Sequence, residues 1–128
     1  MTRYLTAQQV VFAHARLIEA TGGSHGVRDV GLLESSVARP QATFEGRDLY
    51  NDLFKKTAAL FESLILNHPF VDGNKRTAIS AAALFVQLNG LKLDVTNDEL
   101  ERFPLHVVKT RPPLTQIAKW FRENTSPA

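Results

Sequence analysis

One short segment in the middle of the chain holds most of the residues that could carry out chemistry. It runs from His68 to Thr77 and reads His-Pro-Phe-Val-Asp-Gly-Asn-Lys-Arg-Thr. A histidine titrates near neutral pH and can accept a proton from a hydroxyl. A carboxylate suits a hard cation such as Mg²⁺, and cationic side chains suit phosphate oxygens. The combination predicts a site for the phosphates of a nucleotide.

Each polar residue of this segment has a predicted role. His68 is the candidate catalytic base, and Asp72 is the candidate ligand of Mg²⁺,. A glycine permits a positive φ or the close approach of a ligand. An arginine offers phosphate a planar fork of donors, and a lysine offers a mobile point charge. The candidate nucleotide-binding residues are Gly73, Asn74, Lys75 and Arg76.

Helical patterns flank the segment on both sides. Apolar residues recur at helical spacing from Asn51 to Asn67, and again from Ala78 until Gly90,. Asn74 is therefore expected at or near the N-cap of the second helix, where a short polar side chain is preferred. The first amides of that helix lack intrahelical partners and lie at the positive end of the helix dipole. Such a terminus readily binds anions.

The same residues also have a purely structural interpretation. A histidine that precedes a proline at a helix end is usually a cap or a packed side chain,. An Asp-Gly pair is usually a turn, and a Lys-Arg pair on a first helical turn is more often solvated. The joint occurrence of these residues at these spacings is what favours the phosphate site.

The segment from His68 to Arg76 resembles the core motif of the Fic/Doc superfamily, which has the Fido fold, and specifically its death-on-curing (Doc) branch. The resemblance implies an all-α fold in which the motif loop and the following helix N-terminus hold ATP phosphates and a magnesium ion. It covers nearly the whole chain. The further matching positions are Gly22-Gly23, the segment 26–34, Arg39-Pro40 and Asn89-Gly90.

Two positions bear on which group is transferred. Fic members typically move an AMP group onto a target hydroxyl, and they usually have glycine at the place of Lys75 and a further arginine at the place of Ile79. Both departures are typical of the Doc branch, whose members act as protein kinases. Gly73 is Fic-like, since the Doc archetype has alanine there. We therefore predict a Ser/Thr protein kinase that transfers the γ-phosphate of ATP. A Fic-type AMP transferase is the alternative, and a non-catalytic nucleotide-binding or interaction module is a more distant one.

The resemblance also implies partners. The Doc archetype phosphorylates elongation factor Tu, which blocks translation, and a separate antitoxin holds it inactive. Superfamily members that restrain themselves usually carry an inhibitory helix with a Ser/Thr and a glutamate at a fixed spacing, and this sequence contains no such pattern. We expect a bacterial protein as the target, with elongation factor Tu as the first candidate, and a cognate antitoxin as the inhibitor.

The composition excludes several other classes of protein. A length of 128 residues with 44% hydrophobic residues predicts a single domain, residues 1–128,. The absence of cysteine excludes disulfides and thiolate metal sites,. A net charge of +2 without a basic stripe argues against direct binding of nucleic acid,. No leader or membrane-length apolar run is found, so we expect a cytoplasmic protein without a membrane partner.

The rest of the sequence predicts helices joined by short loops. The fold class is thus all-α, a compact Fido/Doc-like helical domain with at most a minor β-pairing or flap. Leu91 to Val95 alternates as a short strand does, and Tyr4-Leu5 is a possible partner. Pro104 predicts a kink or break in its helix. The further helices are expected from Thr6, as cap, to Ala20, from Asp29, as cap, to Val37, from Asn97 to Thr110 after Thr96 as cap, and from Leu114 to Glu123,.

Four features outside the motif have both structural and functional interpretations. His14 lies on the apolar face of the first helix and is expected to be a packed, hydrogen-bonded histidine rather than a ligand. Arg28 and Glu34 are expected to be solvated charges, with support of the motif loop as the alternative. The polar stretch Gln41–Tyr50 is either a surface connection or, as the resemblance implies, a flap beside the active site.

Overall fold

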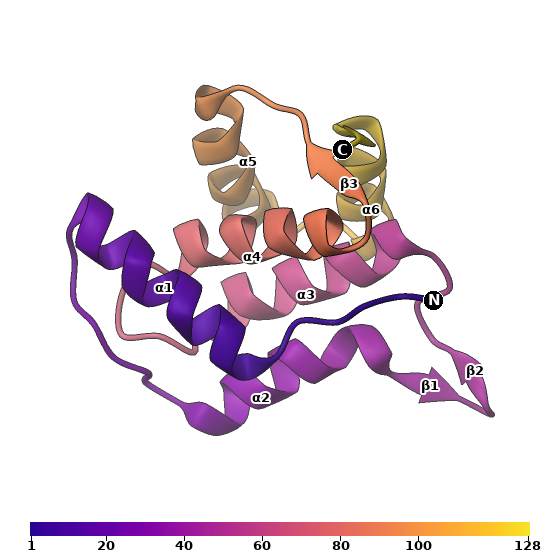
Figure 1. The fold of residues 1–128 in the computed structure, drawn as a ribbon, viewed down its shortest axis with the longest axis horizontal. Coiled ribbons are helices and arrows are strands. Elements are labelled where there is room, and N and C mark those ends of the chain that lie inside the picture. The colour runs from indigo at the N-terminus through magenta and orange to yellow at the C-terminus, as the bar shows by residue number, and fades with distance from the viewer.

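The computed structural model describes residues 1–128 and consists mainly of helices (Figure 1). This confirms the predicted all-α class, since the only sheets are two small antiparallel pairs, β1 with β2 and β3 with β4. The elements are α1 (Ala7–Thr21), α2 (Val30–Ala38), the 3-10 helix η1 (Arg39–Gln41), β1 (Thr43–Phe44), β2 (Arg47–Asp48), α3 (Leu53–Asn67), α4 (Asn74–Leu88), β3 (Leu91–Leu93), α5 (Asn97–Thr110), α6 (Leu114–Glu123) and β4 (Thr125–Pro127).

Helix α3 runs through the centre of the molecule, with α4 antiparallel beside it and α2 and α6 packed on its other sides (Figure 1). Most of its side chains are buried, as expected for a helix that is covered on nearly every face,. Phe61 is completely buried, and its ring packs against the rings of Phe103 and Phe121. The core therefore packs against α3 on both sides. The two ends of α3 lie at opposite edges of the domain.

The predicted helix starts are confirmed where a side chain caps the helix. Thr6 and Thr96 each form a capping box with the glutamine or glutamate three positions on,. Asp29 accepts a hydrogen bond from the backbone of Leu32, and Asp52 accepts one from Lys55,. The predicted N-cap of α4 is shifted by one position, because Gly73 is the cap and Asn74 is the first helical residue.

Two expectations about secondary structure were wrong in detail. Helix α5 continues without a break across Pro104, which is buried in the core. The strand β3 pairs with the C-terminal strand β4 and not with Tyr4-Leu5. In α5, the capping box and the acidic residues of the first turn stabilise the helix, the latter through the helix dipole,. They help to offset the loss of the hydrogen bond that Pro104 cannot donate,.

The stretch Gln41–Tyr50 contains a small exposed hairpin, β1–β2, in place of irregular chain. The hairpin lies at the N-terminal end of α3, whereas the motif loop follows the C-terminal end of α3 (Figure 1). The expectation of a flap beside the motif loop is therefore wrong for this structure. The buried Lys56 ties the hairpin to α3 through an ion pair with Asp48, at 3.0 Å.

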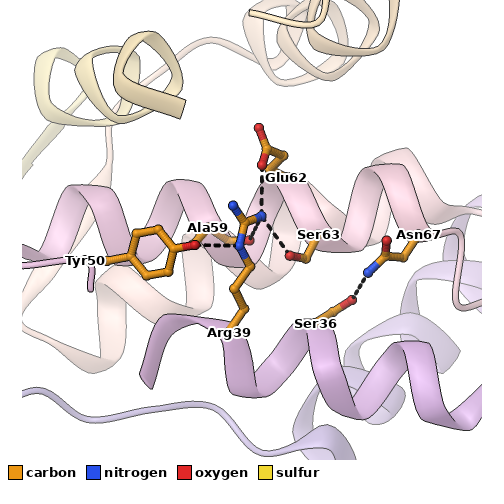
Figure 2. A network of polar contacts seen from close by, with 7 residues as sticks. All are labelled: Ser36, Arg39, Tyr50, Ala59, Glu62, Ser63 and Asn67. Carbon is orange, nitrogen blue, oxygen red and sulfur yellow. Dashed lines mark hydrogen bonds and ion pairs between the residues drawn. The ribbon is translucent and has the colours of Figure 1, made fainter. Parts of the chain in front are cut away.

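A polar network holds η1, directly after α2, against α3 (Figure 2). The guanidinium of Arg39 donates to the hydroxyl of Tyr50 at 2.8 Å and to a carboxylate oxygen of Glu62 at 2.8 Å. It also donates to the hydroxyl of Ser63 at 3.0 Å. One turn later on α3, Asn67 donates to Ser36 of α2 at 3.0 Å. These bonds fix α2 and η1 along the half of α3 that leads to the motif loop.

None of the helices combines the length and the apolar character that a membrane-spanning segment needs.

Candidate active site

The motif loop connects the end of α3 to the start of α4, and a residue with positive φ stands at each end. His68 follows the last residue of α3 with φ 49° and ψ 56°, in the left-handed region. Gly73 precedes the first residue of α4 with φ 74° and ψ 22°. Between them, Phe70 is almost fully buried and anchors the loop in the core. The imidazole of His68 remains exposed.

Asn74 holds the loop closed with its side chain. Its Oδ1 accepts a hydrogen bond from the amide of Phe70 at 3.0 Å, and its Nδ2 donates to the carbonyl of Phe70 at 3.0 Å. Because both groups of the side-chain amide bond the loop, the donors of Asn74 that remain for a ligand are its backbone amide and the second hydrogen of Nδ2,. Its predicted contact with phosphate remains a prediction.

His14 is a packed, hydrogen-bonded histidine, as predicted. It is 3% exposed, and its ring stacks on Phe70 with centroids 3.9 Å apart. Its Nε2 lies 2.8 Å from the carbonyl oxygen of Asp72. Since a carbonyl oxygen can only accept, Nε2 carries the proton. Helix α1 therefore supports the motif loop through His14.

Asp72 is an exposed carboxylate that the backbone holds in place. Its Oδ1 accepts the amide of Gly73 at 2.8 Å, and its Oδ2 accepts the amide of Ser24 at 3.1 Å. These two backbone hydrogen bonds lower the pKa of Asp72, and the nearby Arg76 adds to the effect,. A Cβ at position 23 would lie 2.7 Å from Oδ2, so glycine is needed where this loop passes the carboxylate,.

The first turn of α4 presents unpaired donors. The amide of Thr77 bonds the carbonyl of Gly73, so the amides of Asn74, Lys75 and Arg76 have no intrahelical acceptor,. Lys75 is exposed and makes no hydrogen bond with its side chain. The guanidinium of Arg76 bonds the hydroxyl of Thr21 and, at 3.4 Å, the carbonyl of Gly22. This end of α4 can thus bind an anion by amides, dipole and cations together.

The segment before α2 pairs with the motif loop along its backbone. Val27 forms a bridge with Phe70, and the amide of Val71 donates to Gly26 at 3.0 Å. The carbonyl of Pro69 accepts two amides, from Arg28 at 2.7 Å and from Asp29 at 3.1 Å. The two segments are therefore joined as neighbouring antiparallel strands are, at one isolated bridge, although neither segment is a strand.

The side chain of Arg28 also binds the motif loop, so the expectation that it is a solvated charge was wrong. Its Nε donates to the carbonyl of His68 at 2.6 Å, and its second terminal nitrogen donates to the carbonyl of Asn67 at 2.8 Å. Glu34 is exposed, as predicted, and makes no ion pair. Ser24 and Thr21 are neighbours of the site that were not predicted. For Arg28, support of the loop was the alternative interpretation, and the match of residues 26–34 to the family was the signal that pointed to it.

A divalent cation bound at Asp72 would have to complete its shell from a nucleotide and water. No group of three or more histidine, aspartate or glutamate side chains lies together that could hold a metal. Mg²⁺ commonly takes one or two carboxylates, with phosphate oxygens and water as the remaining ligands. The carboxylate of Asp72, two residues before the first free amide of α4, fits that mode of binding.

Position 79 faces the core and not the loop. Ile79 is 6% exposed and belongs to the main apolar cluster. Arg76 is therefore the arginine that this helix offers at the motif loop.

Comparison with known proteins identifies relatives over the region that contains the site. Residues 4–86 match the Fic/DOC family. A protein named Toxin Doc from Mycolicibacterium smegmatis is 52% identical over 93 residues, which are 73% of this chain and 69% of that protein. Protein kinase doc from Escherichia phage P1 is 32% identical over 91 residues, which are 71% of each chain.

The carboxyl group of Asp72 is expected to titrate below its ordinary pKa, because backbone amides stabilise the charged form,. A lowered pKa means that the carboxylate adds stability above the unfolded-state pKa of about 3.9, and that this is lost as pH falls through the folded pKa. NMR titration of the side-chain carboxyl carbon measures the midpoint directly. The difference in unfolding free energy between the parent and Asp72→Asn should also shrink below about pH 4. A midpoint at or above the ordinary value would show that the two amides do not bind the carboxylate.

Proposed function

Because this chain belongs to the Fic/DOC family, and within it to the Doc branch, we propose that it is a toxin that phosphorylates a bacterial protein. The reaction transfers the γ-phosphate of ATP to a serine or threonine hydroxyl. The relative from phage P1 is named a protein kinase, and the mycobacterial relative is named a toxin. Elongation factor Tu is the first candidate for the target.

The composition of the first turn of α4 is the observation that supports transfer of the γ-phosphate. Three free amides, Lys75 and Arg76 can neutralise phosphate oxygens there. A further arginine, which would grip a second phosphate in the AMP-transfer orientation, is replaced by the buried Ile79. The cationic groups are therefore concentrated on one turn, which favours one phosphoryl group as the centre of charge neutralisation.

The polar side chains of the loop have separate roles in the proposed reaction. The exposed His68 would take the proton of the attacking hydroxyl,. Asp72 would hold Mg²⁺, which would supply positive charge to neutralise the phosphate oxygens. Lys75, Arg76 and the amides of α4 would orient the transferred group. Because phosphoryl transfer has a loose transition state, positioning and charge neutralisation supply most of the rate.

AMP transfer remains the competing reaction, and Gly73 is the residue that favours it. The local packing, however, accounts for this glycine without reference to the transferred group. Gly73 has a φ of 74°, and a Cβ there would lie 3.0 Å from the side chain of Ile18. A residue other than glycine would be strained by both the backbone and the neighbour. Gly73 therefore carries little weight against the kinase.

The proposed toxin would be inhibited by another chain, the antitoxin, and an apolar groove on the surface could bind it. The groove lies between α1 and α4, and Phe12 and Leu84 are exposed in it, by 63% and 38%. Helix α1 ends at Thr21, which bonds Arg76. An antitoxin segment that folds as an amphipathic helix on binding would fit such a groove.

The first test asks which phosphorus is transferred. The purified chain is incubated with Mg²⁺ and ATP labelled at either the α- or the γ-phosphate, with elongation factor Tu or a bacterial extract as acceptor. Label from the γ position is the expected result, and mass spectrometry of the modified residue should show a phosphate. Label from the α position alone would replace this proposal by AMP transfer.

The second test concerns His68. Its left-handed backbone makes asparagine a better replacement than alanine, because asparagine tolerates that conformation,. His68→Asn should lower turnover by about 10²–10⁴-fold, as loss of a general base does. ATP affinity, measured by titration calorimetry, should not change, because the phosphate groups bind α4. Turnover at the parent level would remove His68 from the role of base.

The third test concerns the antitoxin and the α1–α4 groove. The chain should be toxic when it is expressed alone in a bacterial host, and a small protein encoded beside it should neutralise it. Phe12→Asp should abolish that neutralisation while toxicity persists, because a charge in the groove opposes an apolar helix face. Leu105→Asp, at a side chain that is 54% exposed on α5, is the matched control. Equal neutralisation of Phe12→Asp and the parent would exclude the groove.

A further inference from the structure

The C-terminal end of α3 lacks the usual backbone closure. A helix that ends in a left-handed residue commonly satisfies its last carbonyls with the amides of that residue and the next. Here the left-handed residue is His68, the next is Pro69, which has no amide hydrogen, and the amide of His68 has no acceptor,. Two donors of the usual motif are therefore missing.

Helix α5 provides a comparison within the same chain. It also ends in a left-handed residue that is not glycine, Arg111, and a proline also follows. There, however, the amide of Arg111 donates to the carbonyl of Val107 at 2.9 Å and closes the helix. His68 has the same backbone conformation without this bond, so another group must hold it.

Arg28, which lies before α2, supplies two other donors at this end of the helix. Its guanidinium donates to the carbonyls of Asn67 and His68, at 2.8 Å and 2.6 Å. A cation at this position also interacts favourably with the negative end of the α3 dipole. Two donors in a rigid plane bind two successive carbonyls, which restrains the peptide unit between Asn67 and His68 and hence the direction of the imidazole.

The side chain of Arg28 is exposed, but the backbone of Arg28 is tied to the same loop. Its own amide donates to Pro69, the residue after His68, at 2.7 Å. The side chain of Asn67 is held from the other side by Ser36 on α2, at 3.0 Å (Figure 2). Asn67 and Pro69, on either side of His68, are thus each held by a hydrogen bond. The guanidinium of Arg28 bonds the carbonyls of Asn67 and His68 between these two points.

We propose that Arg28 is a positioning residue for the transfer reaction, which holds His68 in its left-handed conformation by capping the end of α3. This inference rests on the proposed function, in which His68 is the base. The hydrogen bonds of Arg28 go to Asn67, His68 and Pro69, and none goes to the first turn of α4. The loss of Arg28 should therefore change the rate of the chemical step and leave the binding of ATP unchanged.

The test compares Arg28→Ala, Arg28→Lys and the parent. In the parent, the ¹³Cα and ¹³Cβ shifts of His68 should report a left-handed backbone, with a high amide order parameter. In Arg28→Ala the shifts should move toward averaged values and the order parameter should fall. The kcat should fall by about 10- to 100-fold, as expected from a misplaced catalytic group, with an unchanged KM for ATP. Arg28→Lys should restore part of both effects, because an ammonium can bind one carbonyl but not both in one plane.

Arg3→Ala is the matched control, since Arg3 is exposed and its hydrogen bonds are made by its backbone. It should leave the shifts of His68 and the kcat unchanged. If Arg28→Ala does not fold, Arg28→Lys and Arg28→Gln supply the same two readouts. Parent-like shifts and order parameter at His68, or a higher KM with unchanged kcat, would overturn the inference. A parent chain with no transfer activity would instead count against the proposed function, and the NMR comparison would still decide whether Arg28 holds His68.

Discussion

The pairing of residues 26–29 with residues 67–71 is the contact on which the whole site depends. The motif loop contains two left-handed residues, of which His68 is not a glycine and so costs about 1–2 kcal/mol in its backbone conformation,. Such a conformation persists only where the surroundings determine it. Here three backbone groups of the preceding segment, two amides and one carbonyl, and the guanidinium of Arg28 do so. Without this pairing, the loop would be held only by the burial of Phe70, by His14 and by the side chain of Asn74.

The core determines where this loop stands. Both α3 and α4 carry fully buried alanines, among them Ala58 on α3 and Ala81 and Ala82 on α4. Small side chains let the two antiparallel helices lie close together, so the end of α3 and the start of α4 meet over a short loop,. A candidate base at a helix C-terminus and a set of free amides at a helix N-terminus are thereby placed side by side, by packing that is remote from both.

The sequence predicts those parts of the fold that local signals determine. The capped helix starts, the long apolar faces and the buried histidine His14 follow from periodicity and capping residues, and the structure confirms them. The partner of β3, the position of the hairpin and the contacts of Arg28 depend on which distant segments meet, and no local pattern encodes that. The prediction made for Asn74 was limited in the same way. The type of this residue predicts a polar contact at the start of α4, but only the closed loop shows that both of its polar groups are used by Phe70.

The charges of the site are held before any substrate arrives. Asp72 is fixed by two amides, and Arg76 is fixed by the end of α1. Lys75 is the one charged side chain of the motif that stays free to follow a ligand. Groups that are already oriented stabilise a transition state without the cost of reorganisation at the moment of reaction. Because α1 holds Arg76 and, through His14, the carbonyl of Asp72, the position of α1 sets the geometry of both the anion-binding cation and the candidate metal ligand. A partner that binds the groove along α1 would therefore act on the same two residues that the proposed chemistry requires.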